Sequence, residues 1–248
     1  MSSELSGTTA LVTGATSGIG RAAAVELARL GAKVVVSGRN QARGQQVVED
    51  IRAAGGEALF LASDLSDAAA VRSLAERAKE HAGQVDILVN NAGIFPFGPT
   101  HETSEQDFEA VYALNVKAPY FLVAELAPAM AQRGHGAIIN VTTMAAEIGA
   151  SGMSLYGSSK AALTLLTKAW AAEYGPRGIR VNAVSPGPTR TEGTAGMEEE
   201  LKALAAVGPA GRPGTADEIA SAVAYLATDA ASFVHGAILP VDGGRTAV

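Results

Sequence analysis

Short apolar runs rich in β-branched residues alternate with longer helical segments along nearly the whole chain. Six such runs stand out: Thr9–Thr13, Lys33–Ser37, Glu57–Ala62, Asp86–Asn90, Ala137–Val141 and Arg180–Val184. Helical patterns fill the intervals at about 18–30, 40–54, 67–82, 104–132, 153–175 and 216–228. Buried strands that alternate with helices are typical of a parallel sheet covered on both faces, and handed crossovers make it doubly wound. We therefore expect an α/β, Rossmann-like fold with about seven parallel strands.

The chain carries no linker, low-complexity tract or charge run that would divide it. Its 248 residues suit either one large α/β domain or two small ones, and we expect a single domain over residues 1–248. Residues 191–214 differ, because they are rich in Gly, Ala and Glu, with Met197–Leu201 as a short helical candidate. A long segment of weak structure in a compact domain is often a lid. An irregular surface excursion is the alternative.

Composition excludes several classes of function. The net charge of −6 disfavours a nucleic-acid partner, which would need a basic surface. The chain has no cysteine, so disulfides, thiol nucleophiles and thiolate metal sites are excluded. The four histidines lie far apart in the sequence, so no metal site is expected. The start lacks the features of a secretion signal and no run of eighteen uncharged apolar residues occurs, so we expect a cytoplasmic protein without a membrane span.

A glycine-rich turn follows the first strand directly and opens the first helix. Glycines at such a turn let a pyrophosphate approach backbone N–H groups at the positive end of a helix. No lysine follows the last glycine, so an ATP-type phosphate loop is disfavoured. The candidate dinucleotide-binding residues of this turn are Gly14, Thr16, Ser17, Gly18, Ile19 and Gly20.

The end of the second strand indicates which dinucleotide is bound. An acidic residue there would hydrogen-bond the adenosine ribose and repel a 2′-phosphate, but this chain has Arg39. A guanidinium forms charge-assisted contacts with phosphate, so NADP(H) is favoured, with NAD(H) as the alternative. An arginine that is only solvated in the first turn of a helix is the structural alternative. Asp64, followed by Leu65, is placed to accept from the adenine amine or to cap the next helix.

A tyrosine and a lysine four residues apart, Tyr156 and Lys160, would share one face of a helix. An ammonium beside a phenol favours the phenolate, so the pair predicts a tyrosine that exchanges a proton near neutral pH instead of near its usual pKa of about 10.

These motifs, in this order, resemble the short-chain dehydrogenase/reductase family over about residues 5–244. The matching segments are the turn Thr13–Gly20, Asn90–Gly93, Tyr156–Lys160, Ser185–Gly187 and Val241–Gly244. The resemblance implies that Tyr156 is the general acid or base and that Lys160 also binds the nicotinamide ribose. It further implies cofactor contacts from Asn91, Ala92, Gly93, Pro186, Gly187, Thr189 and Thr191.

Thr143 stands where the family places a serine that hydrogen-bonds the substrate oxygen, thirteen residues before the tyrosine. Threonine keeps the hydroxyl donor, although its methyl group restricts χ1 and narrows the pocket. Thr142 and Ser154 are the alternatives for this role, and ordinary strand-end packing is the alternative for both threonines.

Asn115 matches the family position whose backbone carbonyl holds a water on the proton path to the lysine. In a regular helix that carbonyl would accept from the N–H of residue 119, which is Pro119 and has none. The carbonyl would then be free for a water, although a simple proline kink gives the same pattern.

The resulting hypothesis is an NADP(H)-dependent oxidoreductase that interconverts a ketone or aldehyde with its alcohol. 3-Oxoacyl thioesters and general ketones are equally compatible substrates, and the apolar Ile94–Phe97 segment suggests an apolar substrate surface or simply core. A catalytically silent NADP-binding regulatory or scaffold protein is the alternative, and an epimerase or dehydratase is a third reading. The helix after Lys160 is apolar on more than one face, which favours the homotetramer that is common in the family. A helix covered by its own chain is the alternative.

Overall fold

The computed structural model describes residues 4–248 and contains one seven-stranded, fully parallel sheet with the strand order β3-β2-β1-β4-β5-β6-β9. The strands are β1 Thr9–Val12, β2 Lys33–Gly38, β3 Glu57–Ala62, β4 Ile87–Asn90, β5 Gly136–Val141, β6 Ile179–Pro186 and β9 Ile238–Val241. The expected doubly wound α/β fold is confirmed. The chain order reverses between β1 and β4, and open α/β sheets bind their ligands at such a switch point.

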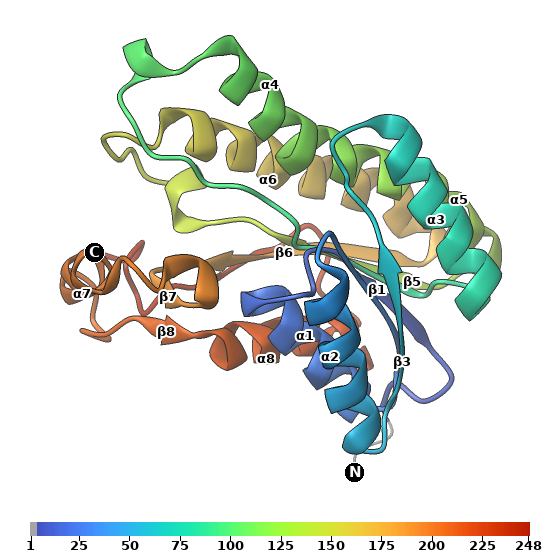
Figure 1. Ribbon diagram of the computed structural model, residues 1–248. Coiled ribbons are helices and arrows are strands. Elements are labelled where there is room, and N and C mark those ends of the chain that lie inside the picture. The colour runs from blue at the N-terminus through green and yellow to red at the C-terminus, as the bar shows by residue number, and fades with distance from the viewer. Residues whose placement is uncertain (1–3) are drawn as a thin grey trace.

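Two layers of helices enclose the sheet (Figure 1). The helices α1, α2 and α8 cover one face, and α3, α5 and α6 cover the other. The helices are α1 Gly18–Arg29, α2 Gln41–Ala53, α3 Ala68–Ala82, α4 Glu105–Tyr112, α5 Ala118–Arg133, α6 Ser154–Tyr174, α7 Glu198–Ala206 and α8 Ala216–Ala227. Short 3-10 turns include η1 Thr100–Glu102, η3 Met144–Ala146, η4 Gly175–Arg177, η5 Glu192–Thr194 and η6 Asp229–Ala231.

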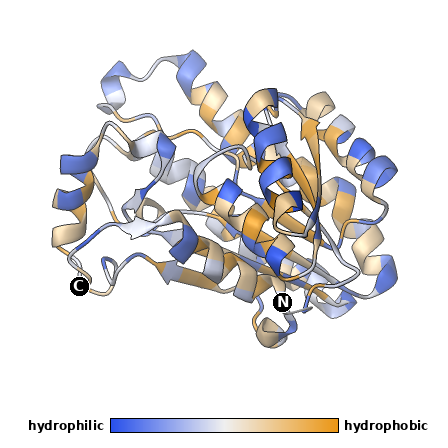
Figure 2. Ribbon diagram, turned by 60° about the horizontal axis from the view of Figure 1, so that its bottom comes forward, coloured by the Kyte–Doolittle hydropathy of each residue, from blue (hydrophilic) through white to orange (hydrophobic). Residues whose placement is uncertain are grey.

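The strands in the centre of the sheet are apolar on both faces, as Figure 2 shows by the hydrophobic colouring between the two layers. Alternate residues of β1 enter opposite cores: Val12 packs with the α1 side and Leu11 with the α5 side. Both side chains are fully buried. Such two-sided burial explains why the strands are continuous apolar runs and not alternating ones.

The seventh strand was not located in the sequence, although the strand count was expected. β9 contains Pro240, which cannot donate a ladder hydrogen bond, and it lies at the edge of the sheet beside β6. Proline is tolerated on edge strands, so its presence weakened the sequence signal without preventing the strand. The two-residue strands β7 Thr189–Arg190 and β8 Gly214–Thr215, which pair with each other, were also missed.

The segment expected as one helix over 104–132 is divided. A π-helical turn, η2 Ala113–Lys117, separates α4 from α5, and the N–H of Ala118 bonds to the carbonyl of Ala113. Pro119 lies in the first turn of α5, where its missing N–H costs nothing. The helical segment expected over 104–132 is therefore confirmed, and it departs from a regular α-helix at the widened turn before Pro119.

A buried polar chain fixes α6 against the sheet. Asn90 of β4 donates to Asn140 of β5 at 2.9 Å, and Asn140 donates to Thr167 of α6 at 2.8 Å. Asn140 and Thr167 are fully buried, so a shift of α6 would leave the polar groups of both residues buried without a hydrogen-bond partner, at a cost in stability.

Within the described residues, no helix is long and apolar enough to cross a membrane.

Candidate active site

A cavity of about 660 Å³ opens at the carboxyl ends of the strands. It extends from the ends of β2 and β3, across the switch point between β1 and β4, to η3, the start of α6 and the η5–α7 segment. The predicted site residues that line it are Gly14, Thr16, Ser17, Gly18, Ile19, Arg39, Asp64, Leu65, Asn91, Ala92, Gly93, Thr143, Tyr156, Lys160, Pro186, Gly187, Thr189 and Thr191. Two predicted residues, Gly20 and Asn115, do not line the cavity and lie behind its wall.

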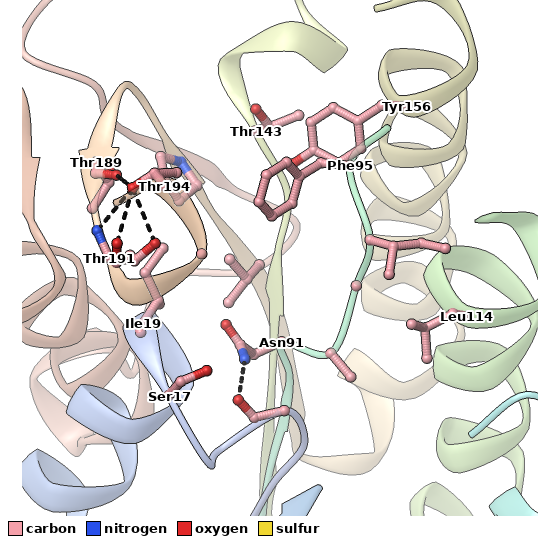
Figure 3. Close-up of a pocket in the computed structure, with 18 of the residues that line it drawn as sticks. Ser17, Ile19, Asn91, Phe95, Leu114, Thr143, Tyr156, Thr189, Thr191 and Thr194 are labelled. Atoms are coloured by element: carbon pink, nitrogen blue, oxygen red, sulfur yellow. Dashed lines mark hydrogen bonds between the residues drawn. The ribbon is translucent and has the colours of Figure 1, made fainter. Parts of the chain in front are cut away.

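The glycine-rich turn is locked to the loop after β4. Gly14 has a φ of +63°, and a Cβ there would lie 2.9 Å from the Cα of Ala92. The Thr13 hydroxyl oxygen accepts from the backbone N–H groups of Asn91 at 3.0 Å and Ala92 at 3.1 Å. The Asn91 side chain donates to the Gly14 carbonyl at 3.2 Å (Figure 3). Only glycine fits this left-handed conformation and close approach.

The N-terminus of α1 holds a carboxylate from a distant segment. The Gly18 N–H donates to Glu192 Oε2 at 2.7 Å, and Ser17 at the N-cap makes no side-chain cap. A helix N-terminus attracts anions, and the carboxylate of Glu192 stands where a pyrophosphate oxygen would be accepted. The turn therefore fits a dinucleotide. Glu192 escaped the sequence analysis because 174 positions separate it from its partner.

The adenosine end of the cavity carries two arginines. Arg39 follows β2, and Arg43 from the first turn of α2 lines the same end. The hydroxyl of Ser37 is buried, lines the cavity and has no hydrogen-bond partner among the described residues. Two guanidinium groups and a spare hydroxyl are suited to a phosphate ester. Arg43 was missed, although its spacing of four residues from Arg39 could have drawn attention to it.

Tyr156 and Lys160 lie one turn apart on α6, as their spacing predicted. Thr143, at the N-cap of η3, lies beside the Tyr156 side chain, and Figure 3 shows the two together with the ring of Phe95. The Phe95 and Tyr156 ring centroids are 6.2 Å apart in an edge-on arrangement. Three side chains from separate segments thus converge on one end of the cavity.

The comparisons with known proteins agree with this geometry. The family described as enoyl-(acyl carrier protein) reductase matches residues 14–246. A solved structure described as a short-chain dehydrogenase/reductase family protein is 50% identical and has a TM-score of 0.91, with 99% of this chain and 100% of that chain covered. The chain belongs to the short-chain dehydrogenase/reductase family.

Two further relatives of this short-chain dehydrogenase/reductase have specific descriptions. The 3-oxoacyl-[acyl-carrier-protein] reductase FabG of Escherichia coli is 38% identical over 239 residues, which are 96% of this chain and 97% of that protein. A structure of a putative NAD(P)-dependent gluconate 5-dehydrogenase from Beutenbergia cavernae, with bound NADP, is 38% identical, has a TM-score of 0.93 and covers 99% of both chains. The descriptions of these two relatives differ in substrate, and the gluconate 5-dehydrogenase structure contains NADP.

Burial shifts the pKa values of both members of the tyrosine–lysine pair. Burial raises the pKa of the Tyr156 phenol, and the neighbouring Thr143 hydroxyl offsets this only in part. Burial lowers the pKa of Lys160 to about 8, and its Nζ donates to the Val141 carbonyl at 2.8 Å. Desolvation is thus the largest influence on both groups in the protein chain alone, and acidification of the phenol by Lys160 together with a bound nicotinamide stays a prediction.

Asn115 holds the short-chain dehydrogenase/reductase site together through its side chain. The amide is fully buried, its Oδ1 accepts from the Ile94 N–H at 3.0 Å, and its Nδ2 donates to the Ile94 carbonyl at 2.9 Å and to the Ser159 hydroxyl at 3.0 Å. It therefore joins the loop after β4 to α6. Asn115 lies in the π-turn η2, and the expectation that its backbone carbonyl is free to hold a water stays a prediction. Such turns occur frequently at functional sites.

Two alternatives to Thr143 are otherwise engaged. The Thr142 hydroxyl donates to the Val184 carbonyl at 3.0 Å. Ser154 Oγ pairs with the Thr100 hydroxyl at 3.0 Å and does not line the cavity.

On the opposite wall, the Thr194 hydroxyl donates to the Thr189 carbonyl at 3.0 Å (Figure 3). Among the described residues, no group of three His, Asp or Glu could hold a metal ion.

Proposed function

We propose that this protein is an NADP(H)-dependent reductase that interconverts a ketone or aldehyde with its alcohol, with Tyr156 as general acid and base. The observation that carries the proposal is the meeting of Tyr156, Thr143 and Lys160 at one end of a cavity whose other end is suited to a dinucleotide. NADPH supplies the hydride when it is bound. The names of the relatives are compatible with this chemistry, because they include a 3-oxoacyl-[acyl-carrier-protein] reductase and a gluconate 5-dehydrogenase.

Different residues would bind different parts of the dinucleotide. Arg39 and Arg43 would hold a 2′-phosphate, and the Ser37 hydroxyl would add a donor. The N–H groups of the Gly14–Gly18 turn would face the pyrophosphate. Asp64 would accept from the adenine amine, and Leu65 would cover the base. The preference for NADP(H) over NAD(H) rests on the two arginines and on the lack of an acidic residue at position 39.

At the reacting end, the raised pKa of Tyr156 keeps the phenol protonated at neutral pH. A protonated phenol is the form that donates to a carbonyl oxygen during reduction, and in the reverse reaction the phenolate would accept the proton from the alcohol. Thr143 would donate a second hydrogen bond to that oxygen. Lys160 would bind the nicotinamide ribose, and Thr189 and Thr191 would position the nicotinamide or pyrophosphate.

We also propose that a water held at Asn115 continues the proton path to Lys160. Asn115 and Lys160 lie close together, and this supports the proposal. Both side chains approach the same side of Gly93, since a Cβ added there would lie 3.1 Å from Asn115 Oδ1 and 3.3 Å from Lys160 Nζ. The segment 191–214 would act as a lid over the substrate, since Thr191, Met197 and Leu201 line the cavity from it.

A cytoplasmic homotetramer is proposed as the working form. Large apolar side chains are exposed on the outer helices: Tyr120 of α5 is 48% exposed and Leu165 of α6 is 69% exposed. Burial of such groups against a second copy would remove them from water.

A substrate panel run with NADPH and NADH tests the proposal, with Tyr156→Phe as the matched variant. Turnover of at least one carbonyl by the wild type, and a loss of roughly 10³-fold in the variant with cofactor binding retained, is expected. Absence of turnover with either cofactor would instead support the catalytically silent, nucleotide-binding alternative.

A further inference from the structure

The half of the cavity beyond Tyr156 is lined almost entirely by apolar side chains. They come from the loop after β4, from η3, from the segment before α6 and from α7, and they are Phe95, Phe97, Met144, Ala145, Met153, Met197, Leu201 and Leu204. Three of the five methionines of the chain are among them. Methionine is flexible and polarizable, and it adapts to ligands of different shape.

No charged group of the cavity is available to a substrate in this half. The charged residues among the described lining are Arg39, Arg43, Asp64 and Lys160. The first three lie at the adenosine end, and the buried Lys160 ammonium already donates to the Val141 carbonyl at 2.8 Å. A substrate carboxylate placed beside the methionines would lose its hydration without gaining a cation.

The cations within and next to the segment 191–214 are also engaged. Arg190 pairs with Glu198 at 2.9 Å, Lys202 with Glu199 at 2.9 Å and Arg212 with Glu218 at 2.6 Å. These six residues are absent from the cavity lining. A carboxylate could recruit one of these cations only by breaking its existing ion pair.

Hydrogen-bond donors for a polyhydroxylated substrate are equally few. The Thr194 hydroxyl donates within its own loop, to the carbonyls of Thr189 and Thr191. Tyr156 and Thr143 remain, and both are required at the reacting oxygen. Each substrate hydroxyl buried here without a partner would weaken binding.

We infer that the substrate is a ketone or aldehyde with an uncharged, apolar alkyl or aryl body, and not a sugar acid or an oxo acid. This inference rests on the proposed carbonyl reduction and narrows its substrate class. The methionine lining further implies that several apolar carbonyls of different shape are reduced with similar efficiency.

The test compares two substrates that share the ring and the ketone and differ at the carboxyl group: ethyl 4-oxocyclohexanecarboxylate, which is neutral, and the charged free acid, each with NADPH. The ester is expected to have a kcat/KM at least roughly 10-fold higher, because the acid buries an unpaired charge. 5-Ketogluconate should be weaker still. An acid that reacts as well as its ester would overturn the inference and leave the proposed function intact, whereas failure of every carbonyl would overturn the proposed function itself.

A pair of variants asks whether α7 faces the substrate. Leu204→Arg adds a cation to the apolar half, and it should lower the ester-to-acid ratio by about 10-fold, mainly by improving the acid. Ala203→Arg adds the same charge on the exposed neighbouring position, outside the cavity lining, and should leave the ratio unchanged. NADPH affinity and circular dichroism verify that both variants fold. An unchanged ratio in a folded Leu204→Arg variant would contradict the inference.

Discussion

The two halves of the cavity are built by different means. The dinucleotide half depends on backbone N–H groups, on the positive φ of Gly14 and on loops locked together by Thr13 and Asn91. The substrate half depends on apolar side chains, and two of them, Leu201 and Leu204, are carried by α7. A backbone site recognises what all members of the family bind, and a side-chain site can change with each member. Four predictions test how strict this division is.

The largest effect is expected from Gly14→Ala. An alanine would be strained at a φ of +63°, and its Cβ would lie 2.9 Å from the Ala92 backbone, so cofactor affinity should fall about 100-fold or more. The control is Gly196→Ala in the lid, where nothing lies within 4 Å of the added Cβ. Isothermal titration with NADPH measures both variants. Equal effects at the two positions would mean that the dinucleotide half is no stricter than the lid.

Lys160→Met should weaken cofactor binding roughly 10- to 100-fold by removing charged hydrogen bonds, and yet stabilise the fold. Burial lowers the Lys160 pKa from 10.5 to about 8, so between these values the unfolded chain holds more protons than the folded one. The free energy of unfolding of the wild type therefore rises with pH across that window. Below the window, the charged buried lysine lowers the free energy of unfolding. At pH 7 the variant should be more stable by roughly 1–3 kcal/mol.

Urea denaturation at pH 7 and pH 9.5 checks this effect. The stability advantage of Lys160→Met should shrink at the higher pH, because the wild-type lysine is then largely neutral. A variant that is less stable than the wild type at both pH values would show that the Val141 contact outweighs the cost of desolvation.

Arg39→Ser asks whether a side chain decides selectivity within the backbone-built half. Loss of one charge-assisted phosphate contact should raise the KM for NADPH roughly 10- to 100-fold and leave the KM for NADH nearly unchanged. Arg43→Gln should have a smaller effect in the same direction. The assignment of Arg39 to the 2′-phosphate is wrong if the wild-type enzyme prefers NADH. It is also wrong if Arg39→Ser raises the KM for NADPH and the KM for NADH by the same factor.

Glu192→Gln should produce the smallest change, in the opposite direction. The Glu192 carboxylate holds the Gly18 N–H at 2.7 Å and would compete with the pyrophosphate, so its neutralisation should tighten NADPH binding about 2- to 5-fold. Glu199→Gln is the control, because Glu199 is exposed and its only ion pair within residues 4–248 is with Lys202. Fluorescence titration of NADPH separates the two. Weaker binding in Glu192→Gln would indicate that the contact supports the dinucleotide site.

Local signals in the sequence were sufficient for the frame of the molecule. The apolar runs located six of the seven sheet strands, because strands that are buried on both faces form nearly continuous apolar runs in the sequence. The turn after β1 and the spacing of Tyr156 and Lys160 located both ends of the cavity, since each depends on residues close in sequence. β9 was not located, because an edge strand with Pro240 carries only a weak pattern.

The sequence by itself thus determined the fold class and the family, and it predicted the reacting side chains, because all of these depend on short-range patterns. Only the tertiary structure decided the ionisation of Tyr156 and Lys160, since desolvation depends on what surrounds them. It likewise placed Glu192 on the N-terminus of α1 and gathered three methionines around the substrate half. Contacts between distant segments have no spacing rule, so they become visible only when the chain has folded.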